Sequence, residues 1–307
     1  QADAYPAKDL VAKANSILTA VKSEDFGDVA TTVSFALWQG NVSALDKLSS
    51  AYFSTKSEVK EKLMQGNQIR DAKDYYFGSA FYYEKELYWG LDRLTHLEDR
   101  LTELGARNVQ ENKGACPIEL KAPEKLDSKN KVNLYYYPSL NSPYTFVSTQ
   151  RVREMKAEYP VNLITKPVLP MLMRSMTIPN FQAKYIISDA AREGRKHYHE
   201  MKSIYSPIGK PARKSYSLYP IIDDAGKGFE YIEALLKASF QDGINIGNED
   251  FLEGLVKELE LDWSVIKKDL NTQHWKNALK SNLEDMYAGN CWGVPSFKIT
   301  DLDGSNQ

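Results

Sequence analysis

The chain has 307 residues, a formal net charge of −2, 42% hydrophobic residues and 26% charged residues. This length allows one large or two ordinary domains, and the composition is that of a soluble globular protein. A net charge near zero provides no basic field, so we expect no nucleic acid partner. No apolar run approaches the roughly 18–20 residues of a membrane span, so we expect no membrane partner either.

Neither the cysteines nor the histidines form a recognisable site in the sequence. Cys116 and Cys291 lie far apart and no C-x-x-C is present, so we expect two free thiols in a reducing compartment. The alternative is that Cys291, next to Trp292, is reactive. The four histidines show no metal-ligand spacing, and we expect no metal. No signal peptide opens the chain, which favours a cytoplasmic protein, but the first residue, Gln1, leaves open that a targeting segment was removed.

The first hundred residues have a mostly helical pattern. Apolar residues recur with helical spacing, which predicts helices over 5–24, 29–38, 42–53, 56–69 and 91–104. Before the last of these, the aromatic run 75–83 predicts a strand, and 87–89 predicts its hairpin partner. The polar stretch 106–130 contains two prolines and one glycine and predicts a linker. We therefore expect one domain at 1–105 and another at 131–307.

The stretch after the linker, KVNLYYYPSLNSPYTFV at 131–147, predicts a strand, a loop and the start of a helix. Its apolar and aromatic run 132–137 has strand character. Ser142 stands in the N-cap position before Pro143, and this pair strongly favours a helix start. A helix N-terminus carries unpaired N–H groups and a partial positive charge, which suits an anion such as a thiolate. Ser142 is placed to donate a hydrogen bond to that anion.

A second strand is predicted at 159–165, and a strand–helix–strand unit of this kind usually forms a parallel, right-handed crossover. Residues 166–214 contain five prolines, and within them a helix is predicted at 183–198. Helical spacing predicts further helices at 227–241, 250–259, 263–270 and 273–288. The segment Gly293-Val294-Pro295-Ser296-Phe297 then leads into a last strand. A helical insertion is therefore expected at about 167–290.

The S-P-Y motif at Ser142 and the G-V-P-S-F motif at 293–297, with helices between them, resemble the DsbA-like branch of the thioredoxin fold. Together they look like the motifs of 2-hydroxychromene-2-carboxylate isomerases and kappa-class glutathione transferases. The resemblance covers roughly residues 131–300. It implies an α/β, thioredoxin-like (DsbA-like) fold with a large helical insertion, in which a cis Pro295 faces the helix N-terminus.

The resemblance also implies roles for individual residues. In glutathione-dependent relatives the serine that matches Ser142 hydrogen-bonds the sulfur of glutathione, which would make Ser142 the catalytic residue. Val294, before Pro295, would offer backbone hydrogen bonds to a peptide-like ligand, and Tyr144 and Trp292 are candidate substrate contacts. Structural alternatives stay open: a plain N-cap for Ser142, a structural cis turn for Pro295 and a packed aromatic ring for Tyr144.

The order of predicted elements also suggests an internal repeat. Residues 35–41, FALWQGN, resemble residues 238–245, ASFQDGIN, and the strand at 78–81 then takes the place of 294–297. On this interpretation residues 1–105 are a mostly helical, partial copy of the same domain. This first copy lacks the proline that the fold expects.

A second family motif, W-G-x-D-R-L, is found in the first copy as 89–94 and contains Asp92. In related isomerases and transferases the aspartate of this motif contacts the backbone of glutathione. Its expected place is after the last strand of the second copy. Three interpretations follow: the chain is a fragment, the chain is permuted, or Asp92 completes the site of the second unit.

The main functional hypothesis is a glutathione-dependent isomerase or transferase that acts on a small electrophilic molecule. The glutathione thiolate, held by Ser142, would add to the substrate and then leave again or stay bound. A carboxylate on the substrate could meet Lys166, Lys184 or Arg192, although isolated basic residues usually lie on the surface. A DsbA-family oxidoreductase-like protein is an alternative, but the segment 142–145, SPYT, stands where a C-x-x-C would be. A third is a non-catalytic thioredoxin-like binding module. Such relatives often form homodimers, which leaves a homodimer open.

Overall fold

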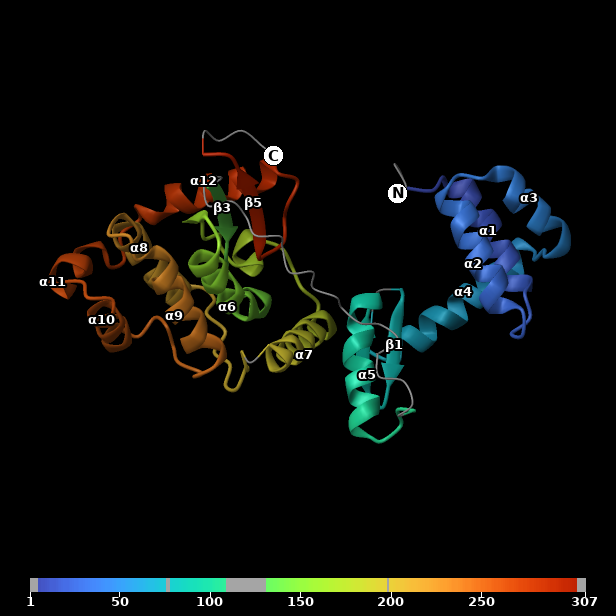
Figure 1. The fold of residues 1–307 in the computed structure, drawn as a ribbon, viewed down its shortest axis with the longest axis horizontal. Helices are drawn as coiled ribbons and strands as arrows, with labels where there is room; N and C mark the ends of the chain where they lie inside the picture. The colour runs from blue at the N-terminus through green and yellow to red at the C-terminus, as the bar shows by residue number, and fades with distance from the viewer. Residues whose placement is uncertain (1–4, 76–77, 109–130, 198, 303–307) are drawn as a thin grey trace. The chain divides into compact units, whose positions relative to one another are not determined.

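The computed structural model describes residues 5–75, 78–108, 131–197 and 199–302 (Figure 1). The chain forms two compact units, Gln1–Gly78 and Ser79–Gln307. Most of the predicted linker, residues 109–130 with Cys116, lies outside the described residues. The domain limits at 105 and 131 and the internal repeat therefore stay predictions.

The first unit is helical and has a small core. The predicted helices are confirmed as α1 (Lys8–Ala20), α2 (Phe26–Trp38), α3 (Val42–Ala51) and α4 (Lys56–Asp71). Apolar spacing along α1, α2 and α3 places one face of each helix in the core, whose buried members are Ala14, Ile17, Val33, Ala36 and Leu45. At the start of α4, Thr55 and Glu58 satisfy each other's backbone N–H groups in a capping box.

The second unit begins with a β-hairpin, as predicted. β1 (Ala80–Tyr83) pairs antiparallel with β2 (Glu86–Trp89). The turn residues Glu84 and Lys85 both have positive φ angles, as a two-residue turn that matches the strand twist requires. The strand predicted over 75–83 is too long, because Ser79 has a φ of 57° that interrupts the extended chain.

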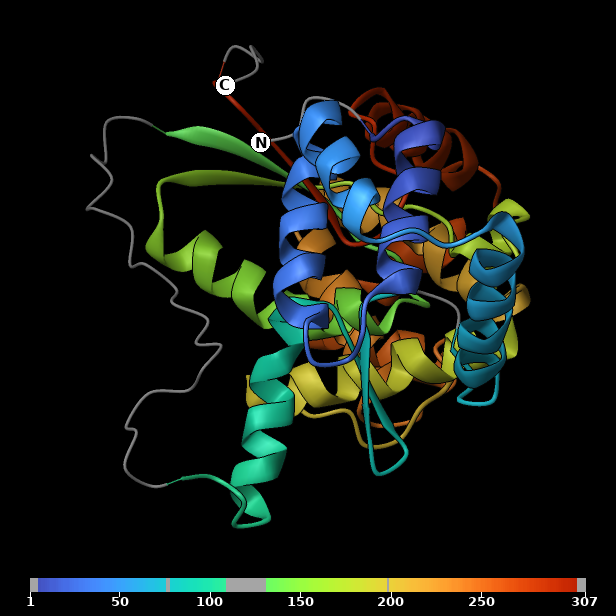
Figure 2. The same cartoon turned by 90° about the vertical axis from the view of Figure 1, so that its right-hand side faces the viewer.

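The central sheet of the second unit has three strands in the order β4–β3–β5. β3 (Val132–Tyr137) pairs in parallel with β4 (Val161–Thr165) and antiparallel with β5 (Ser296–Thr300). Helix α6 (Pro143–Glu158) connects β3 to β4, and Figure 2 shows these two strands side by side with α6 next to them. The predicted parallel crossover is confirmed. Because β3 is the middle strand, most of its aromatic side chains are buried.

A helical block lies between β4 and β5 in the chain, as predicted. Its elements are η2 (Met171–Arg174), α7 (Asn180–Lys196), α8 (Lys210–Asp224), α9 (Gly228–Phe240), α10 (Glu249–Glu258), α11 (Trp263–Ile266), η3 (Lys267–Asp269) and α12 (Trp275–Ala288). The largest hydrophobic core of the unit lies here, and includes Leu218, Leu235, Leu252 and Leu279. Among the described residues no helix is both long and apolar enough to span a membrane.

Helix α8 is a correction to the sequence analysis, which predicts no helix there. Pro211 stands in its first turn, where a missing N–H costs nothing, but Pro220 lies inside the helix, where proline normally breaks it. Packing outweighs this cost, because α8 buries Tyr216, Leu218 and Ile222 completely.

Candidate functional site

The sheet register brings the two predicted motifs together. β3 ends at Tyr137, and Ser296 at the start of β5 lies opposite it, because the two strands are antiparallel. The loop after β3 leads to Ser142, and the segment before β5 contains the Val294–Pro295 peptide bond, which is cis. The cis proline that the resemblance implies is thus confirmed, and Ser142 and Val294 are in contact.

Ser142 is the N-cap residue of α6 and is 7% exposed. Its side-chain oxygen accepts a hydrogen bond from the Thr145 N–H at 3.1 Å, and its hydroxyl donates to the Val294 carbonyl at 3.4 Å. The donated bond is at the long limit for a hydroxyl donor and is therefore weak. A stronger acceptor can replace the carbonyl while the cap remains, because the two bonds use different parts of the hydroxyl.

The N-terminal end of α6 keeps its positive character. The helix runs for 16 residues, and its first turn contains no acidic residue that would neutralise the partial charge of the helix dipole. The adjacent Ser142 adds an O–H donor. This end of α6 is therefore suited chemically to a negatively charged ligand atom.

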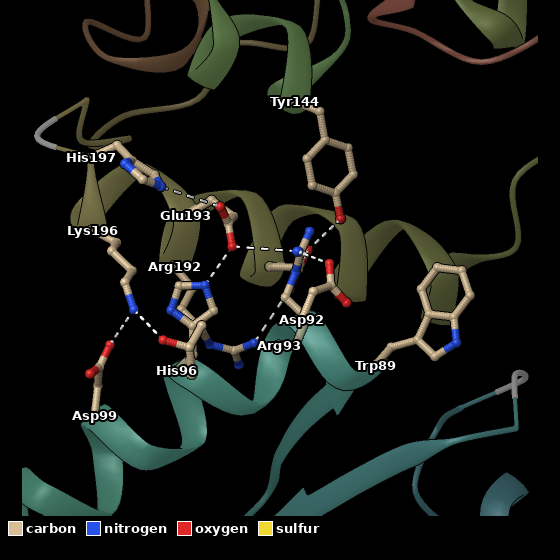
Figure 3. Close-up of polar contacts among 12 residues, drawn as sticks. Trp89, Asp92, Arg93, His96, Asp99, Tyr144, Arg192, Glu193, Lys196 and His197 are labelled. Carbon is tan, nitrogen blue, oxygen red and sulfur yellow. Dashed lines mark hydrogen bonds and ion pairs between the residues drawn. The ribbon is translucent and has the colours of Figure 1, made fainter. Parts of the chain in front are cut away.

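Tyr144 extends from α6 towards α7 (Figure 3). Its hydroxyl donates to Asp189 Oδ2 at 2.8 Å. Burial and the negative charge of Asp189 raise the pKa of Tyr144 well above its ordinary value, so the hydroxyl stays protonated and acts as a donor. Its hydroxyl is thus used inside the protein, and its role as a substrate contact stays a prediction.

Trp292 and Cys291 lie shortly before the cis proline. The Trp292 residue is 61% exposed, and its carbonyl accepts a hydrogen bond from Arg174 Nη1 at 3.3 Å. Cys291 is partly buried and packs against the cluster formed by Tyr137, Val168 and Met286. Trp292 is therefore accessible to solvent, whereas Cys291 sits in an apolar environment.

The W-G-x-D-R-L segment is fastened to α7. It contains the end of β2, the turn η1 (Leu91–Arg93) and the start of α5 (Leu94–Glu103). The exposed carboxylate of Asp92 accepts a hydrogen bond from Arg93 Nη1 at 2.6 Å. Arg93 in turn donates from Nε to Asp189 at 3.0 Å. Asp189 thus binds both this segment and Tyr144 at the start of α6.

Sequence reasoning misses Asp189, which connects these groups. It is 1% exposed, and its carboxylate accepts hydrogen bonds from Arg93, Tyr144, Tyr185 and Arg192. Tyr185 precedes it by four residues and Arg192 follows it by three, so all three share one face of α7. The sequence signal that could have identified Asp189 is an acidic residue on an otherwise buried face of a helix. Its partners on α6 and η1, however, are distant in sequence.

Two further residues of α7, Glu193 and Lys196, hold α5 in place (Figure 3). Glu193 lies 2.5 Å from His96 Nε2, and the hydrogen bond from His96 outweighs burial and lowers the pKa of Glu193. Lys196 donates to Thr95 at 2.6 Å and to Asp99 at 2.8 Å. Several independent polar contacts therefore join α5 to α7.

A cavity of about 440 Å³ lies beside these contacts. Its polar lining includes Arg151 and Glu154 from α6 and Glu193 and Lys196 from α7, together with Arg93. The lining has charges of both signs, which suits a polar or zwitterionic ligand. Ser142 and Val294 are not among the described residues that line it.

Of the three basic residues considered for a substrate carboxylate, Lys166 and Arg192 have partners within the protein, and Lys184 is exposed. Lys166 donates to Asp285 Oδ2 at 2.6 Å, and Asp285 also accepts from Lys298 at 2.6 Å and from the Tyr137 hydroxyl at 2.7 Å. Burial raises the pKa of Asp285, but these hydrogen bonds outweigh burial and hold it well below its usual range. Arg192 donates to the Leu87 carbonyl and to Asp189. In the described part of the chain, no three His, Cys, Asp or Glu side chains are arranged to hold a metal ion.

Comparison with known proteins places this arrangement in a family. No curated protein sequence matches the chain. The chain is similar to the solved structure of a 2-hydroxychromene-2-carboxylate isomerase, with 14% identity, a TM-score of 0.47, and 55% of this chain and 86% of the other covered. It is also similar to the cytosolic disulfide reductase DsbM from Pseudomonas aeruginosa, with 14% identity, a TM-score of 0.47, and 57% and 87% covered. The profile of the DSBA-like thioredoxin domain matches residues 133–306, more than half of the chain. The chain therefore belongs to the family of DSBA-like thioredoxin domains.

Proposed function

We propose that this chain is a glutathione-dependent isomerase or transferase that acts on a small electrophilic organic substrate. One observation carries the proposal: Ser142 caps the N-terminus of α6 and its hydroxyl points to the Val294 carbonyl beside the cis proline. A thiolate at this position would gain from the helix dipole and from an O–H donor. Both favour the charged form of the glutathione thiol and would lower its pKa.

The Val294 carbonyl would bind the peptide part of glutathione. In the free chain this carbonyl accepts the weak hydrogen bond from Ser142 at 3.4 Å. When the sulfur takes over that hydrogen bond, the carbonyl is released to accept an N–H of the ligand backbone. The exposed carboxylate of Asp92 would be a second acceptor for the ligand backbone, on a segment fastened to α7 by Arg93.

The chemistry needs no redox partner. The glutathione thiolate donates an electron pair to an electrophilic carbon of the substrate and forms a C–S bond. The displaced electron pair moves onto a neighbouring acceptor group of the substrate, which takes up a proton from water. If the adduct rearranges, returns that proton to water and expels the sulfur as a thiolate when the C–S bond breaks, the reaction is an isomerisation and glutathione is regenerated. If the C–S bond remains, the reaction is a conjugation.

A non-catalytic binding module is the second candidate, and one observation favours it. Ser142 is 7% exposed, and its hydroxyl already makes both a donated and an accepted hydrogen bond. A serine in this state functions as an ordinary N-cap. Disulfide exchange has less support, because Ser142, Pro143, Tyr144 and Thr145 supply no thiol at the start of α6.

Titration calorimetry with glutathione tests the proposal. The wild-type chain should bind with a Kd between micromolar and millimolar, and Ser142→Ala should weaken binding about 5- to 30-fold, which corresponds to about 1–2 kcal/mol for a lost hydrogen bond to a charged atom. Asn248→Ala is the matched control, because Asn248 caps α10 in the same way, through Asp250 and Phe251. Asn248→Ala should bind glutathione as tightly as wild type. If the wild-type chain shows no binding at about 10 mM glutathione, the proposal is wrong.

A further inference from the structure

Asp189 is a buried carboxylate that the proposed reaction does not itself use. Its side chain is 2% exposed. A buried charge is costly unless it is paired and hydrogen-bonded, and Asp189 is satisfied by donors from three parts of the second unit: η1, α6 and its own helix, α7. A carboxylate with this many distant partners fixes their positions relative to one another.

Asp189 is connected to Asp92 by hydrogen bonds through Arg93. Arg93 donates from Nε to both Asp189 oxygens at 3.0 Å, and from Nη1 to Asp92 Oδ2 at 2.6 Å. The guanidinium group is planar and rigid, so fixing Nε also fixes the direction of Nη1. The orientation of the Asp92 carboxylate is therefore determined through Arg93 by Asp189.

Asp189 is also connected to the start of α6, by a hydrogen bond from Tyr144. Tyr144, two residues after Ser142, donates to Asp189 Oδ2 at 2.8 Å. Tyr185 reinforces the connection to Asp92, because its hydroxyl donates to Asp189 at 3.3 Å and accepts the backbone N–H of Trp89 at 3.1 Å. Figure 3 shows Tyr144 approaching α7 from α6, and Trp89, Asp92 and Arg93 approaching it from the hairpin and η1.

We propose that Asp189 is a positioning residue of the glutathione site, which holds the Asp92 turn and the Ser142 end of α6 in a fixed arrangement without touching the ligand. This inference rests on the proposed function. Asp92 and Ser142 are the two groups expected to contact glutathione from sequence segments 50 residues apart. Asp189 is bonded to Arg93, the immediate neighbour of Asp92, and to Tyr144, two residues after Ser142. Loss of its charge would release Arg93 and Tyr144 and let the two contact groups separate.

Asp189→Asn tests the inference, because it keeps the shape of the side chain and removes its charge. We expect glutathione affinity to fall about 5- to 30-fold by calorimetry. Glu233→Gln is the matched control: Glu233 is a largely buried carboxylate bound through both oxygens by Arg153, which also lies on α6. It should bind glutathione like wild type.

A double-mutant cycle separates positioning from a general loss of stability. Asp92→Asn alone should weaken binding, and Asp189→Asn should weaken it by a smaller factor in the Asp92→Asn background than in wild type, because part of its effect acts through Asp92. A merely structural role predicts instead that the two fold-changes multiply, which would overturn the inference.

If Asp189→Asn does not fold, Tyr144→Phe takes its place and should weaken binding about 2- to 5-fold. Its matched control is Tyr219→Phe, which removes a buried hydroxyl that donates to the Thr165 carbonyl.

The outcomes distinguish this inference from the proposed function. Absence of glutathione binding by the wild-type chain overturns both. Binding by wild type that is equally tight in Asp189→Asn overturns the positioning role and leaves the proposed function standing. Equal weakening in Asp189→Asn and Glu233→Gln also overturns the positioning role, since a site-specific effect would spare the control.

Discussion

Ser142 contributes to both the fold and the proposed site through one oxygen atom. The atom accepts the Thr145 N–H and so caps α6, while its hydrogen points to the Val294 carbonyl. Only the second bond needs to change when a thiolate binds. The stability of α6 and the binding of sulfur are therefore compatible, and the loss of the cap in Ser142→Ala should cost about 1 kcal/mol in addition to its effect on the ligand.

Asp285 should make the stability of the second unit depend on acid pH. Its pKa is held below the unfolded value of about 3.9, so its contribution is fully present above that value and is lost as the pH falls towards the folded pKa. Asp285→Asn should therefore lower the free energy of unfolding by about 1–3 kcal/mol at pH 7.

Denaturant titrations of wild type and Asp285→Asn at pH 7 and at about pH 3 would check this. The difference in the free energy of unfolding between wild type and Asp285→Asn should narrow at the lower pH, because the Asp285 carboxyl of the unfolded wild-type chain is then partly protonated. A difference that stays constant or widens as the pH falls would show that the Lys166 and Lys298 contacts do not carry the effect.

Helix α8 supports the loop that leads to Ser142. The buried hydroxyl of Tyr216 accepts the Leu140 N–H at 3.2 Å and donates to the Val168 carbonyl at 2.9 Å. Tyr216→Phe leaves both buried backbone groups without that partner, and should lower the free energy of unfolding by about 1–3 kcal/mol. The measurement is denaturant unfolding.

Tyr231→Phe is the control for this prediction. The Tyr231 hydroxyl is equally buried but donates to the Ser215 carbonyl at 2.9 Å, inside α8, where a carbonyl also has a helical N–H partner. Its cost should be smaller than that of Tyr216→Phe. If the two variants lose the same free energy of unfolding, the Tyr216 hydroxyl does not connect two loops, and its ring only fills the core.

The elements that sequence reasoning predicts well are those with local signals. The start of α6 follows from Ser142 and Pro143, and β3 follows from its aromatic run, because capping and strand propensity depend on adjacent residues. Sequence reasoning fails at α8, because Pro220 disfavours a helix that packing nevertheless stabilises. It also fails at Asp189, whose partner Arg93 is 96 residues away and can be identified only from the fold.

At the level of the whole chain, all the proposed site residues belong to the second unit. Asp92, Ser142, Val294 and Pro295 lie within Ser79–Gln307, as does Asp189. A fragment of residues 79–307 should therefore unfold cooperatively and bind glutathione as tightly as the whole chain.

A shorter fragment, residues 106–307, tests the role of the hairpin and α5. It lacks Arg93, the closest cation to Asp189, and also the hydrogen bonds that β2 and α5 make to α7. We expect it to be less stable in denaturant and to bind glutathione more weakly than 79–307. Equal stability and affinity of the two fragments would show that the W-G-x-D-R-L segment is not part of the site.

In the proposed function, Ser142 and the N-terminus of α6 hold glutathione as a thiolate. The most direct test is the pKa of the bound glutathione thiol, followed by the ultraviolet absorbance of the thiolate as the pH is varied. A free cysteine thiol has a pKa of about 8.5. We expect a pKa of the bound thiol below about 7.5 in the wild-type chain and a return towards about 8.5 in Ser142→Ala. A bound thiol with the same pKa as free glutathione in both proteins would contradict it.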